Sequence, residues 1–242
     1  MKLSGKTILI TGGARRVGRA IALAAAREGA DILLHYGQSS QEAASAVAEI
    51  QALGRHAWAF SCDLADLEQV ETLIEKTWEI QPFSVLVNNA SIFEALDWQT
   101  TNRENWQRHL DINLTAPFLL SQAFAKKLAP ANPGRIINLL DWRSLRPGSD
   151  HLPYTISKAA LAALTRSLAT ALAPNITVNG LALGAILPPS NGAGKEQEIL
   201  AQVPAQRWAE LKEVTDSMLF LMTGPGYVTG EILHLDGGRH LV

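Results

Sequence analysis

The stretch DWRSLRPGSDHLPYTISK (residues 141–158) contains three side chains that could move a proton. Tyr154 and Lys158 are four positions apart, so on a helix they lie on one face. An ammonium group near a phenol favours the phenolate and lowers the pKa of the phenol from about 10. Asp141, at the start of the stretch, adds a carboxylate. The pattern predicts a proton relay, although Y-x-x-x-K alone arises by chance in roughly one such chain in ten.

A glycine-rich loop, TGGARRVG (11–18), lies between a predicted strand and a predicted helix. Glycines there let backbone N–H groups approach a pyrophosphate at the helix N-terminus, where the helix dipole also favours negative charge. Two arginines in the first helical turn oppose the dipole, which favours an anionic ligand beside them. We therefore expect a dinucleotide site that includes Gly12, Arg15, Arg16, Val17 and Gly18.

The end of the second predicted strand indicates which dinucleotide binds. An acidic residue about 20 positions after the glycine loop would bind the ribose 2′-hydroxyl and repel a 2′-phosphate. Here LHYGQSSQ (34–41) contains no acid, and the first one is Glu42. This favours NADP(H), with predicted contacts from Tyr36, Gln38, Ser39 and Ser40.

The elements that must position these residues alternate along the chain. Short apolar runs predict strands, and longer amphipathic stretches between them predict helices. The predicted strands are 7–12, 31–36, 56–64, 83–90, 135–140, 176–183 and 231–236, and the predicted helices are 17–29, 40–54, 66–80, 102–128, 154–173 and 210–223. This order predicts one α/β domain over residues 1–242, a doubly wound parallel sheet of the Rossmann type with about seven strands and helices on both faces. The irregular segment 184–210 is expected to be a substrate lid or a surface loop.

Composition excludes several classes of protein. The chain has 242 residues, 47% of them hydrophobic, which is typical of a globular protein and not of a disordered one. A net charge of −2 gives no general reason to expect a nucleic acid or an anionic membrane as partner. A single cysteine, Cys62, cannot form an internal disulfide. With no predicted signal peptide or membrane span, we expect a soluble, cytoplasmic protein. The six histidines do not have the spacing of metal ligands, so no metal site is predicted.

Over essentially its whole length, the sequence resembles the short-chain dehydrogenase/reductase family. The resemblance rests on TGGARRVG, CDL (62–64), NNAS (88–91), Asn113 in DINLTAP, the Tyr–Lys pair and TGEILHLDGG (229–238). It implies a seven-stranded doubly wound sheet and a homotetramer. It places Gly12, Arg16 and Gly18 at the phosphates, Asp63 and Leu64 at the adenine, Asn89 and Ala90 at the ribose, and further cofactor contacts at Ser91, Tyr154, Gly184 and Ile186. It also implies that Lys158 holds the nicotinamide ribose, that Tyr154 donates the proton, and that Asn113 supports Lys158 through a water.

Two positions depart from the family pattern. Most members carry a serine thirteen residues before the tyrosine, which donates a hydrogen bond to a substrate carbonyl, whereas this chain has Asp141. An ionised carboxylate cannot donate to a carbonyl oxygen and would repel the negative charge that develops there. The Pro-Gly after the sixth strand is replaced by Leu183-Gly184.

An aspartate at that position resembles one branch of the family, the pteridine and dihydromonapterin reductases. Arg16 in TGxxxRxG, Phe93 in NNASxF and the ending DGGRHL (236–241) match the same branch. A pterin is reduced at a C=N bond, so its ring nitrogen needs a proton, and an acid at position 141 could feed that proton through Tyr154. The resemblance therefore implies NADPH-dependent reduction of a dihydropterin, such as dihydromonapterin, with dihydrofolate as a further candidate. The implied substrate residues are Arg16, Ser91, Phe93, Asp141, Tyr154 and Leu187.

Simpler interpretations remain open for these residues. Asp141 could form a structural ion pair with Arg143 or Arg146, and Phe93 could be a packing residue. The alternative function is a carbonyl reductase that acts on a ketone or a 3-oxoacyl thioester. A third hypothesis is an NADP(H)-binding regulator without catalytic activity.

Overall fold

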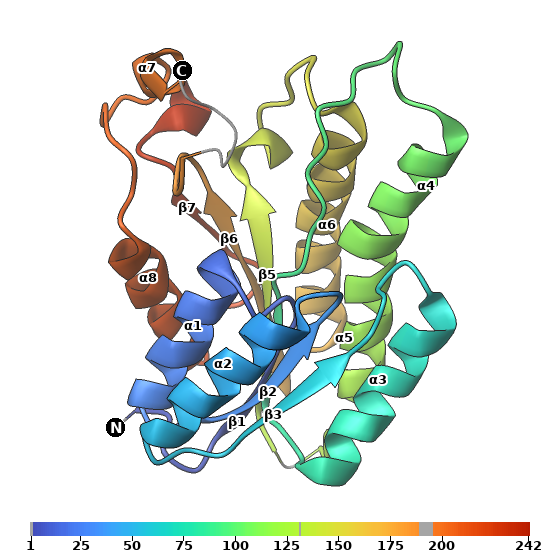
Figure 1. Cartoon of the computed structure of the whole chain (residues 1–242), viewed down its shortest axis with the longest axis vertical. Coiled ribbons are helices and arrows are strands. Elements are labelled where there is room, and N and C mark those ends of the chain that lie inside the picture. The colour runs from blue at the N-terminus through green and yellow to red at the C-terminus, as the bar shows by residue number, and fades with distance from the viewer. Residues whose placement is uncertain (1, 131, 189–195) are drawn as a thin grey trace.

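Seven parallel strands form one twisted sheet in the computed structural model, which describes residues 2–130, 132–188 and 196–242 (Figure 1). The strands are β1 (Thr7–Ile10), β2 (Asp31–Tyr36), β3 (Ala57–Ser61), β4 (Val85–Asn88), β5 (Gly134–Asp141), β6 (Ile176–Leu183) and β7 (Ile232–Leu235). Their order is β3-β2-β1-β4-β5-β6-β7, and every neighbouring pair is parallel. The order reverses between β1 and β4, so the carboxyl ends of these two strands flank the crevice where such sheets bind ligands.

Helices cover both faces of the sheet, which confirms the doubly wound fold (Figure 1). They are α1 (Arg16–Arg27), α2 (Ser40–Ala52), α3 (Leu67–Ile80), α4 (Arg103–Leu110), α5 (Ala116–Lys127), α6 (Leu152–Ala171), α7 (Glu196–Ala201) and α8 (Leu211–Thr223). Successive strand residues point to opposite faces. Ile8 and Ile10 therefore pack with the apolar faces of α1, α2 and α8, whereas Leu9 packs with those of α3 and α5.

The predicted helix 102–128 is interrupted. A π-helical turn, Asp111–Thr115, separates α4 from α5. Pro117 lies in the first turn of α5 and has no N–H to donate to the carbonyl of Asn113, four residues earlier. A continuous α-helix would leave that carbonyl without its ordinary partner, and the wider turn carries the predicted catalytic residue Asn113.

Other predicted boundaries shift by a few residues. The strands β1, β3, β4 and β7 are shorter than predicted, β2 and β6 have the predicted bounds, and β5 is longer by one residue at each end. The helix α6 begins at Leu152, so Tyr154 lies in its first turn. The predicted lid 184–210 contains the short helix α7, and residues 189–195 lie outside the described part of the chain. The two ends of this segment are joined by a hydrogen bond from Ala209 N to Ala185 O of 2.9 Å. Within residues 2–130, 132–188 and 196–242, no helix combines the length and apolarity needed to cross a bilayer.

Candidate active site

The glycine loop brings backbone from two strands into close contact. Gly12 has a φ of +63°, a conformation that residues with a side chain rarely adopt. At Gly18, a Cβ atom would collide with the carbonyl oxygen of Gly12 and lie 2.6 Å from Asn89 Nδ2. Only glycine fits there, because the Gly12 backbone and the Asn89 side chain already fill the space that a side chain would need. This cradle fits the pyrophosphate of a dinucleotide.

Thr11 and Asn89 brace this loop against the end of β4. Thr11 Oγ1 accepts hydrogen bonds from the backbone N–H groups of Asn89 and Ala90, at 2.9 and 3.0 Å. Asn89 Nδ2 donates to the carbonyls of Thr11 and Gly12, at 2.8 and 3.1 Å. Asn89 and Ala90, predicted at the ribose, therefore lie beside the glycine loop, and Asn89 also holds its shape.

His35 is a site residue that the sequence analysis missed. Its Nδ1 accepts a hydrogen bond from Gly12 N at 3.1 Å, so Nε2 carries the proton and donates to Cys62 O at 2.9 Å. Burial lowers the pKa of the ring, which keeps it neutral. The imidazole thus connects the glycine loop to the end of β3. A histidine at the end of an otherwise apolar strand is the signal that could have revealed it.

The remaining predicted cofactor residues follow the ends of β2 and β3, next to the glycine loop. These are Tyr36, Gln38, Ser39, Ser40, Asp63 and Leu64. Ser39 precedes α2 without a capping bond from its side chain, so its hydroxyl is not used by the helix. Arg15 and Arg16 are exposed, and the guanidinium of Arg15 lies 3.7 Å from Glu42. Val17 is partly buried against the core.

The hydroxyl of Tyr154 donates a hydrogen bond of 3.0 Å to Asp141 Oδ2. Asp141 is the last residue of β5, and Tyr154 is buried in the first turn of α6. Burial raises the pKa of Tyr154 well above 10, and the charge and hydrogen bond of Asp141 raise it further. For the chain by itself, the expectation that the Tyr–Lys pair lowers this pKa is therefore wrong, because burial and the Asp141 carboxylate both disfavour the phenolate.

Lys158 points back into the sheet. Its Nζ donates to Leu139 O at 2.7 Å and lies 5.9 Å from the centre of the Tyr154 ring. Burial lowers its pKa to about 8, and Asp141 partly opposes this effect. Lys158 thus shares one face of α6 with Tyr154 as predicted, while its ammonium group binds the backbone of β5.

Asp141 has two sets of partners. Its Oδ1 accepts from the backbone N–H of Arg143 at 2.9 Å, and the guanidinium of Arg143 lies 3.7 Å from the same oxygen. The structural pairing with Arg143 is therefore real, but the other oxygen remains committed to Tyr154. One carboxylate oxygen of Asp141 therefore binds the Tyr154 hydroxyl, and the other binds the turn that follows β5.

Asn113 connects α6 to the segment after β4. Its Nδ2 donates to Ile92 O at 3.1 Å and to Ser157 Oγ at 3.0 Å, and its Oδ1 accepts from Ile92 N at 2.9 Å. Ser157 in turn donates to Tyr154 O at 2.7 Å. Asn113 thus positions both the residue before Phe93 and the first turn of α6. Its predicted link to Lys158 through a water stays a prediction.

Phe93 lies at the surface beside Tyr154. The residue is 54% exposed, so it does not belong to the core. Its ring meets the Tyr154 ring edge-on, with centroids 4.6 Å apart, and lies parallel to the His151 ring at 4.0 Å. The next residue, Glu94, is anchored by Arg108 at 3.0 Å. Phe93 therefore offers a flat ring next to Tyr154.

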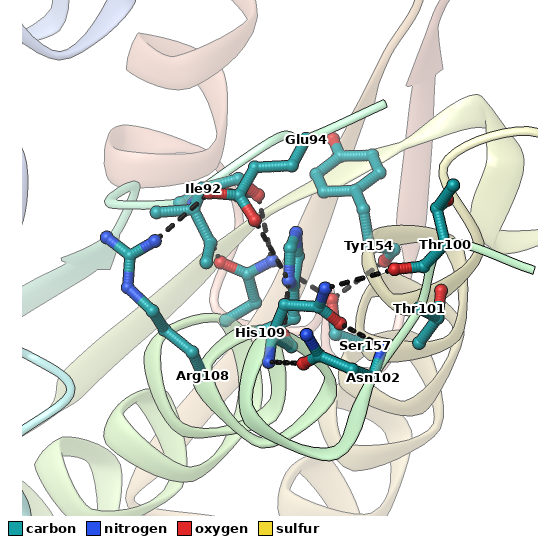
Figure 2. Close-up of polar contacts among 12 residues, drawn as sticks. Ile92, Glu94, Thr100, Thr101, Asn102, Arg108, His109, Tyr154 and Ser157 are labelled. Carbon is teal, nitrogen blue, oxygen red and sulfur yellow. Dashed lines mark hydrogen bonds and ion pairs between the residues drawn. The ribbon is translucent and has the colours of Figure 1, made fainter. Parts of the chain in front are cut away.

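A buried histidine underlies this segment (Figure 2). His109 is fully buried, its Nδ1 donates to Asn105 O at 2.8 Å, and Glu94 lies 3.8 Å away. Within the described ranges, its Nε2 has no hydrogen-bond partner. Sequence reasoning missed His109, because its only signal is a polar residue at a core position of a short helix.

The other predicted site residues lie around the ends of β4 and β6. Ser91 is exposed next to Ala90, whereas Ile186 is buried and Leu187 is partly buried against the core. Gly184 packs so tightly that a Cβ atom would lie 2.5 Å from Asp236 Cα, which explains why glycine is required there. The predicted residues therefore form two groups: one around the glycine loop, and one around Asp141, Tyr154 and Phe93.

Two further features lie outside these groups. A cavity of about 300 Å³ opens behind residue 185, between the end of β7 and the start of α8, and neither Asp141 nor Tyr154 lines it. Across the described parts of the chain, no cluster of three or more histidine, cysteine or acidic residues has the geometry to hold a metal ion.

Comparisons with known proteins agree with this geometry. The sequence is 34% identical to 3-oxoacyl-[acyl-carrier-protein] reductase from Synechocystis sp. over 98% of this chain and 97% of the relative. Among solved structures, FolM alternative dihydrofolate reductase 1 from Brucella canis, complexed with NADP, is similar with a TM-score of 0.92 and 33% identity, covering 100% of this chain and 97% of the other. A short-chain dehydrogenase from Burkholderia cenocepacia in complex with NADP also has a TM-score of 0.92, with 34% identity and 99% coverage of both chains.

A protein-family model settles the broader assignment. Residues 12–240 match the model described as enoyl-(acyl carrier protein) reductase. The match includes the glycine loop, Asn113, the Tyr154–Lys158 pair and β7. With its seven-stranded parallel sheet and this ordered set of residues, the chain belongs to the short-chain dehydrogenase/reductase family.

Proposed function

We propose that this protein is an NADPH-dependent reductase of dihydropterins, with dihydromonapterin or a related compound as substrate and dihydrofolate as a further candidate. The observation that carries the proposal is the 3.0 Å hydrogen bond between Tyr154 and Asp141. A carboxylate bound to the proton donor is poorly suited to an ordinary ketone, because it would repel the charge that develops on the carbonyl oxygen. A ring nitrogen needs a proton rather than stabilisation of an oxyanion.

NADP(H) fits the phosphate end of the site. The cradle at Gly12 and Gly18 accepts a pyrophosphate, and the chain after β2 has no acid before Glu42 to repel a 2′-phosphate. Arg16, Ser39 and Ser40 are available near that position. When bound, the reduced nicotinamide supplies the hydride for a ring carbon of the substrate. Two structural neighbours with similar folds were solved with NADP, which supports this assignment.

The chain's own residues supply the proton and the orientation. Tyr154 gives its hydroxyl proton to the ring nitrogen, and Asp141 then takes up a proton from solvent and passes it to the phenolate oxygen through the same pair of atoms. Lys158 orients the nicotinamide ribose, as the family resemblance implies. Phe93 holds the pterin ring between its own ring and the nicotinamide, with Arg16 and Ser91 at the rim. Similarity to the Brucella canis protein, named an alternative dihydrofolate reductase, supports a reaction of this kind.

A carbonyl reductase is the second candidate function. It is favoured by the 34% identity with the Synechocystis 3-oxoacyl-[acyl-carrier-protein] reductase over nearly the whole chain. Asp141 argues against it, for the electrostatic reason given above. A regulator without activity is a weaker hypothesis, since Tyr154, Lys158 and Asn113 are all in place.

The implied homotetramer stays a prediction that sedimentation analysis would test.

The deciding experiment follows NADPH oxidation by the purified protein. Dihydromonapterin, dihydrobiopterin, dihydrofolate and a panel of small ketones are offered in parallel, with NADH as cofactor control. We expect turnover of at least one dihydropterin above that of every ketone. The variant Asp141→Ser should lose about 100-fold in kcat/KM for the dihydropterin and gain activity on ketones. Ketone turnover above pterin turnover in the unaltered protein would defeat the proposal.

A further inference from the structure

Behind the Phe93 ring, polar side chains lead back to Asp141. His151 lies parallel to Phe93, with 9° between the ring planes. Its Nδ1 lies 2.8 Å from Asp150 Oδ2, and the same oxygen accepts a hydrogen bond of 3.0 Å from Arg143 Nη2. The backbone of Arg143 in turn donates to Asp141. We call Arg143, Asp150 and His151 the polar bridge, because they join the exposed ring to the proton relay.

The two outer members of the polar bridge depend on the middle one. The side chain of Asp150 is 55% exposed, and an exposed ion pair alone contributes little. However, the side chains of Arg143 and His151 are only 13% and 17% exposed. Removal of the Asp150 carboxylate would leave two largely buried donors without their shared acceptor, which is costly. Burial opposes ionisation of Asp150, but the hydrogen bonds and charges of Arg143 and His151 outweigh it and hold the pKa of this carboxyl below its usual value.

His151 is rigidly attached to the catalytic helix. It directly precedes α6, and its carbonyl accepts a hydrogen bond of 2.8 Å from Thr155 N. Its φ of +52° places it in the left-handed region, which residues other than glycine adopt infrequently. This conformation directs the ring toward Phe93 and Asp150. Any shift of His151 would therefore move a surface that contacts Phe93 relative to Tyr154.

Phe93 has few other supports. Its neighbour Ile92 is held by Asn113, but the ring itself contacts His151 on one face and Tyr154 at an edge. His151 covers one face of a residue that is still 54% exposed, so part of the Phe93 ring remains accessible to a second flat ring. The guanidinium of Arg143 is the third group near this ring, 5.7 Å from its centre.

We propose that the polar bridge couples the ring-binding face of Phe93 to the Asp141–Tyr154 relay, so that Asp150 and His151 are positioning residues that favour planar ring substrates over open-chain carbonyl compounds. This inference rests on the proposed function, because it assumes that a ring stacks on Phe93. Asp141 takes its orientation from Arg143, and Phe93 takes its orientation from His151. Asp150 contacts both Arg143 and His151 and so fixes Phe93 relative to Asp141. A ring bound on Phe93 then has its nitrogen within reach of the Tyr154 hydroxyl.

Steady-state kinetics of a set of single and double variants test the polar bridge. Asp150→Ala removes the shared acceptor, and His151→Phe keeps a flat ring behind Phe93 while breaking the link. We expect each to lower kcat/KM for the dihydropterin by about tenfold, and the double variant to lose no more than either alone. Binding of NADPH should stay unchanged. In a Phe93→Ala background, Asp150→Ala should have little further effect. The control Asp216→Asn, in an exposed pair with Lys212 on α8, should behave as the unaltered protein.

The contrary results are equally specific. Full activity of His151→Phe, or of Asp150→Ala, would overturn the polar bridge and leave dihydropterin reduction standing. Equal losses for ketones and dihydropterins would also overturn it, since a general structural defect would explain them.

A crystal structure of Asp150→Ala separates this inference from the proposed function. If the unaltered protein reduces ketones but no dihydropterin, the proposed function fails, and the structure alone decides on the polar bridge. Movement of the Phe93 ring out of its parallel position on His151 would support the coupling. An unchanged stack in the variant would refute it.

Discussion

The phosphate end and the catalytic end of the site are held together by different kinds of chemical group. Around the glycine loop, contacts are made by backbone groups and uncharged side chains: Thr11, Asn89 and a neutral His35. Around β5 and the start of α6, ionisable side chains meet: the buried Tyr154 and Lys158, and the partly buried Asp141. The phosphate end therefore depends on how closely two backbones approach. The catalytic end depends on a balance of charge, burial and hydrogen bonding, so removal of one group or a change of pH should disturb it most.

The largest expected effect separates proton donation from cofactor binding. Tyr154→Phe removes the hydroxyl that binds Asp141 and leaves the phosphate end untouched. We expect kcat to fall by about 10² to 10⁴-fold, because general acid catalysis contributes that much. NADPH affinity, measured by titration calorimetry, should change little. A loss of turnover smaller than tenfold would mean that another group donates the proton.

The phosphate end should respond to an added atom rather than to a lost charge. Gly18→Ala places a methyl group against the carbonyl of Gly12, so one of the two backbones must shift. We expect NADPH affinity to weaken by about 10- to 100-fold, with kcat at saturating NADPH largely retained. Gly226→Ala is the matched control, since a Cβ there meets nothing within 4 Å. Equal affinities in the two variants would contradict the importance of close backbone approach.

The smallest effect concerns pH and stability. Burial lowers the pKa of Lys158 to about 8 from the ordinary value of 10.5, so between these values the native protein binds fewer protons than the unfolded chain. The free energy of unfolding should therefore gain a positive slope with pH in this window, whereas below about pH 8 the cost of the buried charge is fully present. Relative to Lys158→Met, the unaltered protein should gain on the order of 1–2 kcal/mol from about pH 7 to about pH 9.5. Urea unfolding of both proteins measures this difference, and parallel pH curves would show that Lys158 titrates normally.

Sequence reasoning was most accurate where the relevant contacts are local. The alternation of apolar runs and amphipathic stretches predicts the sheet and the helices on its two faces, because the spacing of apolar residues reflects which face of each element is buried. The glycine loop could be placed because it joins adjacent elements. The shared face of Tyr154 and Lys158 follows from helical geometry alone. By contrast, the prediction of one helix over 102–128 missed the break after Leu110, although its cause, the missing N–H of Pro117, is local.

Contacts between distant parts of the chain could not be predicted in this way. The direction of the pKa shift at Tyr154 depends on burial and on a carboxylate from another element, and both are known only after β5 and α6 have packed together. His35 braces the glycine loop through a backbone N–H 23 residues away. The polar bridge exists because a left-handed residue at the start of α6 turns its ring toward a segment after β4.

The sequence by itself determined the order of elements, the place of the cofactor loop and the types of group available for proton transfer. These properties follow from local periodicity and from the chemistry of single residues. Only the tertiary structure decided which group holds which: that Asp141 takes the Tyr154 hydroxyl, that Lys158 binds the backbone of β5, and that Asn113 fixes Ile92. The physical reason is that hydrogen bonds and pKa values depend on distance and burial, which the fold sets for residues far apart in the chain.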